Sequence, residues 1–404
     1  MPDNGLPSGW RWARLGDVAD TRRDLFDPRN ASSLPYVALE NIGQGVPRLI
    51  DYGESSASVS MKTRFKTGDV LFGKLRPHLR KAVRVPFDGV CSTDILALFT
   101  KDGLQSEYLA QLTYASSLQD FAISTSIGTK MPRTSWPALS AYRLPLPPPD
   151  EQRRIAEVLD AIDAAIEKTE TVIAATERLR SALLGELLTR GVPGWHTEWK
   201  QAPGIGTIPA CWEVVRLGDV ADVKNGTTPS KSRSDYWAED GTPFIRTGQV
   251  NDVVIREAEQ FLTPAGVAAG AVIIPRGSVL IAMIGQGKTR GMAARLDIDG
   301  AVNQNFAAVV AKPRLTGDFF FAWAGQHYDE IRGLGQGSNQ GALNCGLVGS
   351  IRLPLPPKAE QQVIVALNAA LADRLTGEQS ALDGIIEAKS MAAAALLSGR
   401  VRVS

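Results

Sequence analysis

The chain repeats itself at a distance of about half its 404 residues, and this duplication limits its possible folds more than any other feature. The string RLGDVAD occurs at 14–20 and again at 216–222. The string RLPLPP occurs at 143–148 and again at 352–357, and each copy is soon followed by Glu-Gln. A period of about 200 residues indicates a tandem duplication and not a solenoid of short units.

Both halves contain the same order of segments. Short β-type runs such as Val70–Phe72 and Val279–Ala282 come first, separated by turn residues. The RLPLPP string then stops regular helix formation, because proline lacks an N–H donor. A long helical pattern closes each half. The predicted organisation is a globular unit at 1–149, a helix at 150–190, a second globular unit at 191–357 and a second helix at 358–404.

The two helical segments each carry one apolar stripe with heptad spacing and one charged face. Two stripes of this length are buried most simply against each other, as an antiparallel coiled coil. The alternative is that each helix packs on the globular unit before it. The predicted fold class is therefore mixed α/β (α+β): two globular units in tandem repeat, separated by two long helices that form an antiparallel coiled coil with pseudo-twofold symmetry. The residues predicted to line this contact are Ile155, Leu159, Ile162, Ile166, Ile173, Leu183, Leu371, Leu375, Leu382 and Ile385.

Composition narrows the class of protein. The chain has 44 Lys and Arg against 43 Asp and Glu, and its three cysteines form no CxxC pair. Cysteines this sparse suit a reducing compartment. No apolar run approaches the ~20 residues of a membrane span, and the first residues lack the order of a signal peptide. These features predict a cytoplasmic protein.

One motif resembles a nucleotide-binding loop. Residues 282–289 read A-x-x-x-x-G-K-T, one residue away from the phosphate-loop pattern. A phosphate loop must lead directly into a helix, whereas residues 290–300 have turn and strand character. The histidines at 78, 196 and 327 lack metal-ligand spacing, and no catalytic motif is present. We therefore expect no catalytic residues and no metal site in this chain.

Clusters of polar and basic residues indicate a nucleic-acid-binding function instead of catalysis. Residues 1–149 carry 18 basic and 14 acidic side chains, a net charge of +4. Lys and Arg suit phosphates and guanine, whereas Asn and Gln suit adenine. The alternative is an ordinary solvated surface with polar turns. The candidate nucleic-acid-binding residues are Lys62, Arg64, Lys74, Arg76, His78, Arg80, Lys81 and Arg84 in the first half, and Gln286, Lys288, Arg290, Asn303, Gln304, Asn305, Ser338, Asn339 and Gln340 in the second.

With these features together, the chain resembles the specificity subunit of type I restriction–modification systems. The resemblance covers nearly the whole chain and depends on W-x-x-x-R-L-G-D-V opening each half and L-P-L-P-P, Glu-Gln and a long helix closing it. It implies that each globular unit is a target recognition domain for one half of a bipartite, asymmetric sequence in double-stranded DNA. It also implies that the helix pair sets the spacing between the half-sites and docks two methyltransferase subunits.

The resemblance further implies that the chain itself is not an enzyme and holds no cofactor. S-adenosylmethionine, ATP and Mg are then expected on the partner subunits, which include restriction–translocation subunits in the full complex. Two alternatives are a self-sufficient enzyme that binds nucleotides or methylates DNA, and a scaffold that binds two proteins and no DNA.

Overall fold

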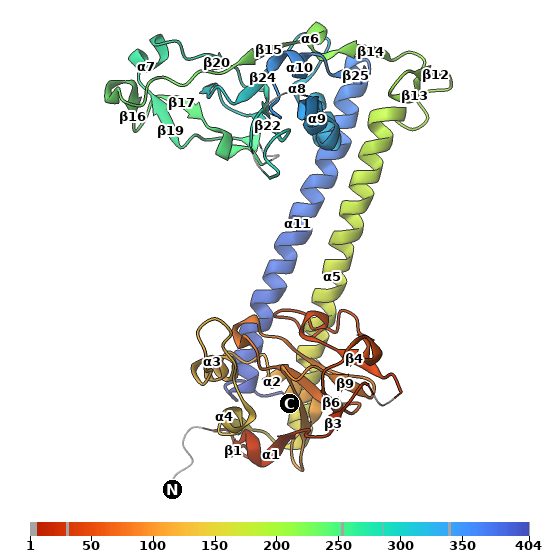
Figure 1. Ribbon diagram of the computed structural model, residues 1–404, viewed down its shortest axis with the longest axis vertical. Coiled ribbons are helices and arrows are strands. Elements are labelled where there is room, and N and C mark those ends of the chain that lie inside the picture. The colour runs from red at the N-terminus through yellow and green to blue at the C-terminus, as the bar shows by residue number, and fades with distance from the viewer. Residues whose placement is uncertain (1–5, 30–31, 252–253, 286, 338–340, 404) are drawn as a thin grey trace. The chain divides into compact units, whose positions relative to one another are not determined.

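The computed structural model describes residues 6–29, 32–251, 254–285, 287–337 and 341–403. The chain divides into two compact units: residues 1–172 with 378–404, and residues 173–377. Each unit therefore contains a globular head and one end of both long helices, α5 (Pro149–Arg190) and α11 (Lys358–Leu397). Figure 1 labels these elements.

The first head contains a two-stranded, a four-stranded and a five-stranded sheet with short helices between them. In sheet order the strands are β1 (Arg11–Arg14) and β11 (Arg143–Leu146); β2 (Ala19–Thr21), β10 (Ile95–Thr100), β7 (Val70–Gly73) and β8 (Ala82–Arg84); and β3 (Leu25–Phe26), β6 (Lys62–Phe65), β9 (Gly89–Cys91), β4 (Pro35–Val37) and β5 (Gly53–Glu54). The helices are α1 (Leu15–Val18), α2 (Ser106–Leu112), α3 (Ser116–Ser124) and α4 (Trp136–Leu139), and the 3-10 turns are η1 (Leu39–Asn41), η2 (Ser55–Ala57) and η3 (Pro77–Leu79).

The second head repeats this plan with additions. Its strands in sheet order are β12 (Trp199–Ala202) and β13 (Gly206–Pro209); β14 (Glu213–Arg216) and β25 (Arg352–Leu355); β15 (Ala221–Asn225), β24 (Phe306–Ala311), β21 (Val279–Ala282), β22 (Ala293–Leu296) and β18 (Val254–Ile255); and β16 (Trp237–Ala238), β19 (Gln260–Leu262), β17 (Thr242–Ile245), β23 (Gly300–Val302) and β20 (Ile273–Ile274). The helices are α6 (Leu217–Val220), α7 (Pro264–Ala268), α8 (Gly317–Gln326), α9 (Tyr328–Gly333) and α10 (Cys345–Gly349), and the 3-10 turns are η4 (Ser234–Tyr236), η5 (Thr247–Gln249) and η6 (Leu334–Gly337).

Strand order confirms the duplication. The order β2-β10-β7-β8 in the first head matches β15-β24-β21-β22 in the second, and β6-β9-β4-β5 matches β20-β23-β17-β19. In both heads the RLPLPP string begins as a short strand that pairs antiparallel with the strand before RLGDV, so that Arg14 faces Arg143 and Arg216 faces Arg352. The repeated strings therefore close each head on itself.

The long helices begin after prolines and end at glycines. α5 begins at Pro149 with acidic residues in its first turn, which suits the positive end of the helix dipole. Gly191 and Gly399 follow the two helices, each with a φ of +76°. This left-handed conformation strains any residue with a Cβ, so that glycine is the natural helix stop.

The apolar stripes of α5 and α11 are buried at both ends of each helix. Each stripe packs partly against the other helix and partly on a head, so that both predicted arrangements occur in part. Ile155 and Leu159 lie in the core of the first head together with Leu396 from the end of α11. Leu187 from the end of α5 and Ile364 from the start of α11 lie in the core of the second head. The start of one helix thus packs with the end of the other in each unit, which is antiparallel pairing, while the same ends pack on a head.

Polar contacts join the two helices in each unit. Lys389 on α11 forms an ion pair with Asp163 on α5, and Arg180 Nε on α5 donates to Asn368 Oδ1 on α11 at 3.0 Å. None of the ten residues predicted to line the helix contact is exposed. They are fully or partly buried: Ile155, Leu159, Ile162, Ile166, Ile173, Leu183, Leu371, Leu375, Leu382 and Ile385.

A repeated buried contact, which we call the helix anchor, fixes the first turn of each long helix to its head. Trp10 Nε1 donates to Glu151 Oε2 at 3.0 Å, and Trp212 Nε1 donates to Glu360 Oε2 at 2.8 Å. The next residue, Gln152 or Gln361, accepts a backbone N–H from the head at 2.8 or 2.9 Å. The repeated Trp and Glu-Gln are therefore structural.

The two helix anchors differ in their third partner. Arg402, after the end of α11, donates to both oxygens of Glu151 at 3.0 and 2.7 Å. At the second anchor, His196, after the end of α5, places Nε2 2.7 Å from Glu360 Oε1. Each anchor thus also holds the segment that leaves the partner helix. The guanidinium of Arg402 lowers the pKa of Glu151 by hydrogen bonding to it.

Candidate nucleic-acid interface

Four loops of the first head meet at one edge of its sheets. β4 and β9 are parallel, so that the loops after them, 38–48 and 92–94, leave the sheet at the same side. The loop at 74–81, between β7 and β8, joins them: Lys74 N donates to Asp94 O at 2.9 Å, and Gly45 N donates to Arg80 O at 3.1 Å. The loop at 125–134 completes what we call the first loop edge.

The second head has the same construction. β17 and β23 are parallel, which brings together the loops at 246–251 and 303–305. Met283 N donates to Asn305 O at 2.8 Å, and Leu343 N donates to Met283 O at 2.9 Å. The loops at 246–251, 283–292, 303–305 and 334–344 form the second loop edge, in so far as they are described. Side chains from distant parts of the sequence therefore converge in each head.

Four of the eight basic candidates in the first half are engaged elsewhere. Lys62 is a correction, because it is only 2% exposed and its ammonium donates to Ser58 and Ser60. Lys81 Nζ donates to Leu39 O at 2.7 Å. Arg64 lies over the ring of Phe26 and 3.6 Å from Asp24, and Arg84 pairs with Glu107 at 2.6 Å. These four side chains therefore already have partners within the head.

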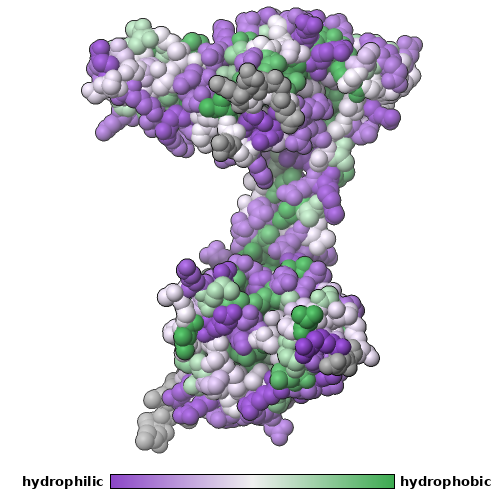
Figure 2. All heavy atoms as spheres, in the orientation of Figure 1, coloured by the Kyte–Doolittle hydropathy of each residue, from purple (hydrophilic) through white to green (hydrophobic). Residues whose placement is uncertain are grey.

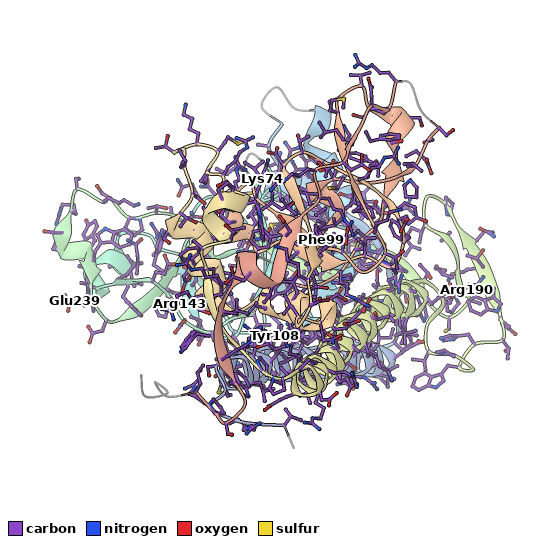
Figure 3. The ribbon with its side chains drawn as sticks, turned by 90° about the horizontal axis from the view of Figure 1, so that it is seen from below. Lys74, Phe99, Tyr108, Arg143, Arg190 and Glu239 are labelled. Carbon is purple, nitrogen blue, oxygen red and sulfur yellow. The ribbon has the colours of Figure 1, made fainter. Side chains whose placement is uncertain are left out.

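The other four candidates share the loop at 74–81, and we call them the cationic turn: Lys74, Arg76, His78 and Arg80. Among the described residues, none of the four forms an ion pair. Asp69, the acidic residue nearest in sequence, is instead held by Arg22 through bonds of 2.8 and 2.9 Å. Figure 3 shows Lys74 apart from Tyr108, which lies close to α5 in that view.

The backbone of the cationic turn is strained. Arg76 and Arg80 flank η3 with φ of 50° and 48°, and in the described chain they are the only residues other than glycine with positive φ. A left-handed conformation costs an L-residue about 1–2 kcal/mol. Such strain concentrates at functional sites, where the surrounding structure holds it in place. The turn therefore presents unpaired cations in a fixed geometry at the first loop edge.

Arg133, Asp94 and Cys91, which lie near the cationic turn, add no net charge to the first loop edge. The hydrogen bond from Arg133 to Asp94 raises the pKa of that guanidinium and neutralises the neighbouring loop at 92–94. Burial raises the pKa of Cys91 to about 12, so that this thiol stays protonated. The positive charge available to a ligand at the first loop edge thus comes mainly from the cationic turn, with the exposed Lys130 beside it.

The candidates in the second half have several different roles. Lys288 is exposed, whereas Arg290 is partly buried and bonds to the carbonyl of Gly341, which ties two loops together. Asn303 Nδ2 donates to Thr247 Oγ1 at 3.0 Å, and the exposed Gln304 accepts a bond from Thr228. Asn305 is partly buried beside them. Four further candidates lie outside the described residues: Gln286, Ser338, Asn339 and Gln340.

Sequence reasoning missed a polar pocket at the second loop edge. It is lined by Arg246, Thr247, Gly248, Gln249, Glu259, Asn303 and Asn305. Arg246 pairs with Glu259 at 2.7 Å through Nη2, while its Nε has no hydrogen-bond partner. The sequence did contain one signal for this pocket: the segments that follow Val37 and Ile245 match each other in the two halves. The parallel strand pairs place the first of these segments beside 92–94 and the second beside 303–305.

The segment that resembles a phosphate loop differs from one in the structure. Residues 287–292 lead into β22 and not into a helix, as the sequence predicted, so the phosphate-loop resemblance fails. The described residues contain no group of three or more His, Cys, Asp or Glu able to hold a metal ion. No described helix is long and apolar enough to cross a membrane. Figure 2 shows mainly hydrophilic surfaces on the heads and hydrophobic side chains along the helices.

Comparison with known proteins places the chain in a family. The model of the "Type I restriction modification DNA specificity domain" matches twice, at residues 7–177 and 209–379. The MjaVIII specificity subunit of Methanocaldococcus jannaschii is 22% identical over 98% of this chain and 94% of its own length. The EcoDI specificity subunit of Escherichia coli is 26% identical, over 45% of this chain and 42% of its own length.

A solved structure has a similar fold. A chain from a study of the assembly and conformational transition of the type I R-M system aligns with a TM-score of 0.66 at 21% identity, over 99% of this chain and 100% of that chain. The chain studied here belongs to the family of type I restriction–modification DNA specificity subunits and contains two copies of its specificity domain. It is a recognition subunit and not a catalytic one.

Proposed function

We propose that each head of this chain binds one half of a bipartite, asymmetric sequence in double-stranded DNA, through its loop edge. The observation that carries this proposal is the cationic turn, in which Arg76 and Arg80 are strained and Lys74, Arg76, His78 and Arg80 lack ion pairs among the described residues. Guanidinium groups that are exposed and lack ion pairs suit phosphates and the O6 and N7 atoms of guanine.

The second loop edge supports a different half-site. Its side chains are mainly amides and hydroxyls, with Arg246 in the pocket and Lys288 exposed. Asn and Gln pair well with adenine N6 and N7. Because the shared scaffold carries different side chains in the two heads, the target is asymmetric.

The helix pair sets the separation of the two half-sites. At 1.5 Å per residue, the 42 residues of α5 extend about 63 Å, longer than the ~34 Å of one DNA turn. The DNA between the half-sites then needs no base contact, so that its length is fixed and its sequence is free.

The helices also dock two methyltransferase subunits. Large apolar side chains remain exposed along them, including Val172, Leu179, Leu367 and Ile386. Restriction–translocation subunits join this core in the full complex. S-adenosylmethionine, ATP and Mg bind those partners, and this chain acts in the cytoplasm.

A head exchange tests the proposal. Residues 1–142 are replaced with those of another family member, and the DNA methylated by the chain with its methyltransferase subunits is mapped by sequencing. We expect one half-site to change and the other to remain. A change in both half-sites, or binding that ignores sequence, would contradict one head per half-site.

A helix insertion tests the spacer. One or two helical turns added after Ile162 should lengthen the gap in the methylated sequence, while the two half-sites stay the same. An equal insertion in the β12–β13 turn at 203–205, outside both long helices, is the control and should leave the gap unchanged. A gap that ignores the helix insertion would show that the helices do not set the spacing.

A further inference from the structure

An exposed apolar tip stands beside the cationic turn. Ile127 is 84% exposed and Met131 is 43% exposed, in a loop that sequence reasoning did not select. Ile127 and Arg133 close this loop through two backbone hydrogen bonds, of 2.9 and 3.0 Å. Gly128 turns the chain with a φ of 103°, a conformation that suits glycine. The tip is therefore a small, closed loop with little apolar contact of its own.

This tip is bound to the cationic turn at several points. Arg76 N donates to Pro132 O at 2.7 Å, and Thr134 N donates to Lys74 O at 3.0 Å. The guanidinium of Arg76 also lies 3.3 Å from the sulfur of Met131. The two loops thus form one surface, and whatever binds the cations also meets Ile127.

The charged groups around Ile127 limit the kind of ligand that this side chain can contact. A single exposed apolar side chain needs no partner by itself, but here it lies beside Lys130 and the cationic turn, so a ligand of that turn must offer both anionic and apolar groups. A duplex satisfies both conditions, because phosphates attract the cations and the C5-methyl group of thymine is apolar and projects into the major groove.

We propose that Ile127 contacts a thymine methyl group in the major groove of the half-site bound by the first head. This inference rests on the proposed function. Arg76 and Arg80, in the same surface, reach guanine atoms in that groove, and Ile127 adds discrimination for an A·T pair over a G·C pair. Ile127 is then a specificity-determining residue that contributes nothing to the fold.

The test compares the full chain, with its methyltransferase subunits, on duplexes that carry its mapped target. Each thymine of the first half-site is replaced in turn by uracil, which lacks the C5-methyl group. We expect uracil at one position to weaken binding by the wild type about fourfold, as the loss of one buried methyl implies. Ile127→Ala should weaken binding to the thymine duplex about three- to tenfold, and uracil at that position should then have no further effect.

Val59→Ala is the matched control, because Val59 is 78% exposed in the same head and lies outside the loop edge. It should bind like the wild type. Equal binding by Ile127→Ala and the wild type would overturn the inference, as would a uracil effect that persists in Ile127→Ala or a first half-site without any A·T pair. Altered DNA bending by Ile127→Ala without a uracil effect would indicate an apolar wedge and also overturn it. The proposed function fails separately, if the wild type shows no sequence-specific binding.

Discussion

The two heads share one scaffold and differ at the surface that the loops form. Both have the same strand order, the same parallel pair and the same Trp–Glu contact at the start of a long helix. At the first loop edge the positive charge lies in the strained turn between β7 and β8. At the second loop edge, the loop between β21 and β22 takes the place of the cationic turn, and its Arg290 donates a hydrogen bond to the carbonyl of Gly341. The pocket that contains Arg246 involves a different loop, at 246–251.

This difference shows how duplication separates stability from recognition. The helix anchors keep their Trp and Glu because a buried indole N–H and a buried carboxylate each need a partner. Residues of the loop edges are under a weaker constraint, since most of their side chains are exposed or only partly buried. The heads could therefore diverge in what they bind while the scaffold stayed fixed.

The largest expected effect is on the shared scaffold. Trp212→Ala should lower the free energy of unfolding of the second unit by about 3–5 kcal/mol, because it removes a fully buried indole and leaves Glu360 without its hydrogen bond. Urea denaturation followed by circular dichroism measures it. Trp12→Ala, at a half-exposed indole, is the control and should cost less than about 1 kcal/mol. Similar losses in both variants would contradict the anchor's role.

The cationic turn should give the next largest effect. Arg76→Ala or Arg80→Ala should each weaken DNA binding by about 1–3 kcal/mol and relax the sequence of the first half-site only. Fluorescence anisotropy at several salt concentrations measures both affinity and salt dependence. Arg84→Ala is the matched control, since that guanidinium already pairs with Glu107. If Arg84→Ala were as damaging as Arg76→Ala, the distinction between paired and unpaired cations would be wrong.

The pocket of the second head sharpens the comparison. Arg246→Ala should weaken binding by about 1–2 kcal/mol and relax only the second half-site. Arg233→Ala, at an exposed arginine paired with Asp235, should leave the affinity unchanged. Methylation mapped by sequencing shows which half-site relaxes. Relaxation of the first half-site by Arg246→Ala would refute the assignment of one loop edge to each half-site.

The smallest effect concerns pH at the first helix anchor. Arg402 lowers the pKa of Glu151 in the folded state. The stabilisation that this pKa shift gives the folded first unit is therefore complete above the ordinary glutamate pKa of about 4.3. It is lost as the pH falls through the lowered pKa of Glu151 in the folded state. Arg402→Met should destabilise the first unit at pH 7, and its difference from the wild type should shrink as the pH falls below about 4.

Urea unfolding at pH 7 and pH 3 measures this difference. Arg400→Met is the control, because Arg400 lies in the same tail and bonds only to Ser398 among the described residues. It should match the wild type at both values. A difference between Arg402→Met and the wild type that stays constant with pH would show that Arg402 stabilises the tail by packing alone.

Local pattern was enough to predict much of this fold. Val70–Phe72 and Val279–Ala282 lie in β7 and β21, and α5 ends at Arg190 as predicted, because apolar periodicity and Gly and Pro stops act over a few residues. The sequence predicts a second helix that reaches 404, whereas α11 ends at Leu397, just before Gly399. The sequence also indicated which half carries clustered basic residues. It could not distinguish Lys62, which folds inward onto Ser58 and Ser60, from Arg76, which is exposed and forms no ion pair among the described residues.

The sequence by itself determined that the chain is a duplication of a β-rich head and a long helix, because identical strings at equivalent positions record it directly. The tertiary structure decided which residues form the two loop edges. Arg246 meets Asn303, and Ile127 lies beside Arg76, only because parallel strands and loop hydrogen bonds bring segments 50 or more residues apart to one side of a sheet. Such convergence depends on strand pairing over long distances in sequence, which no local pattern encodes.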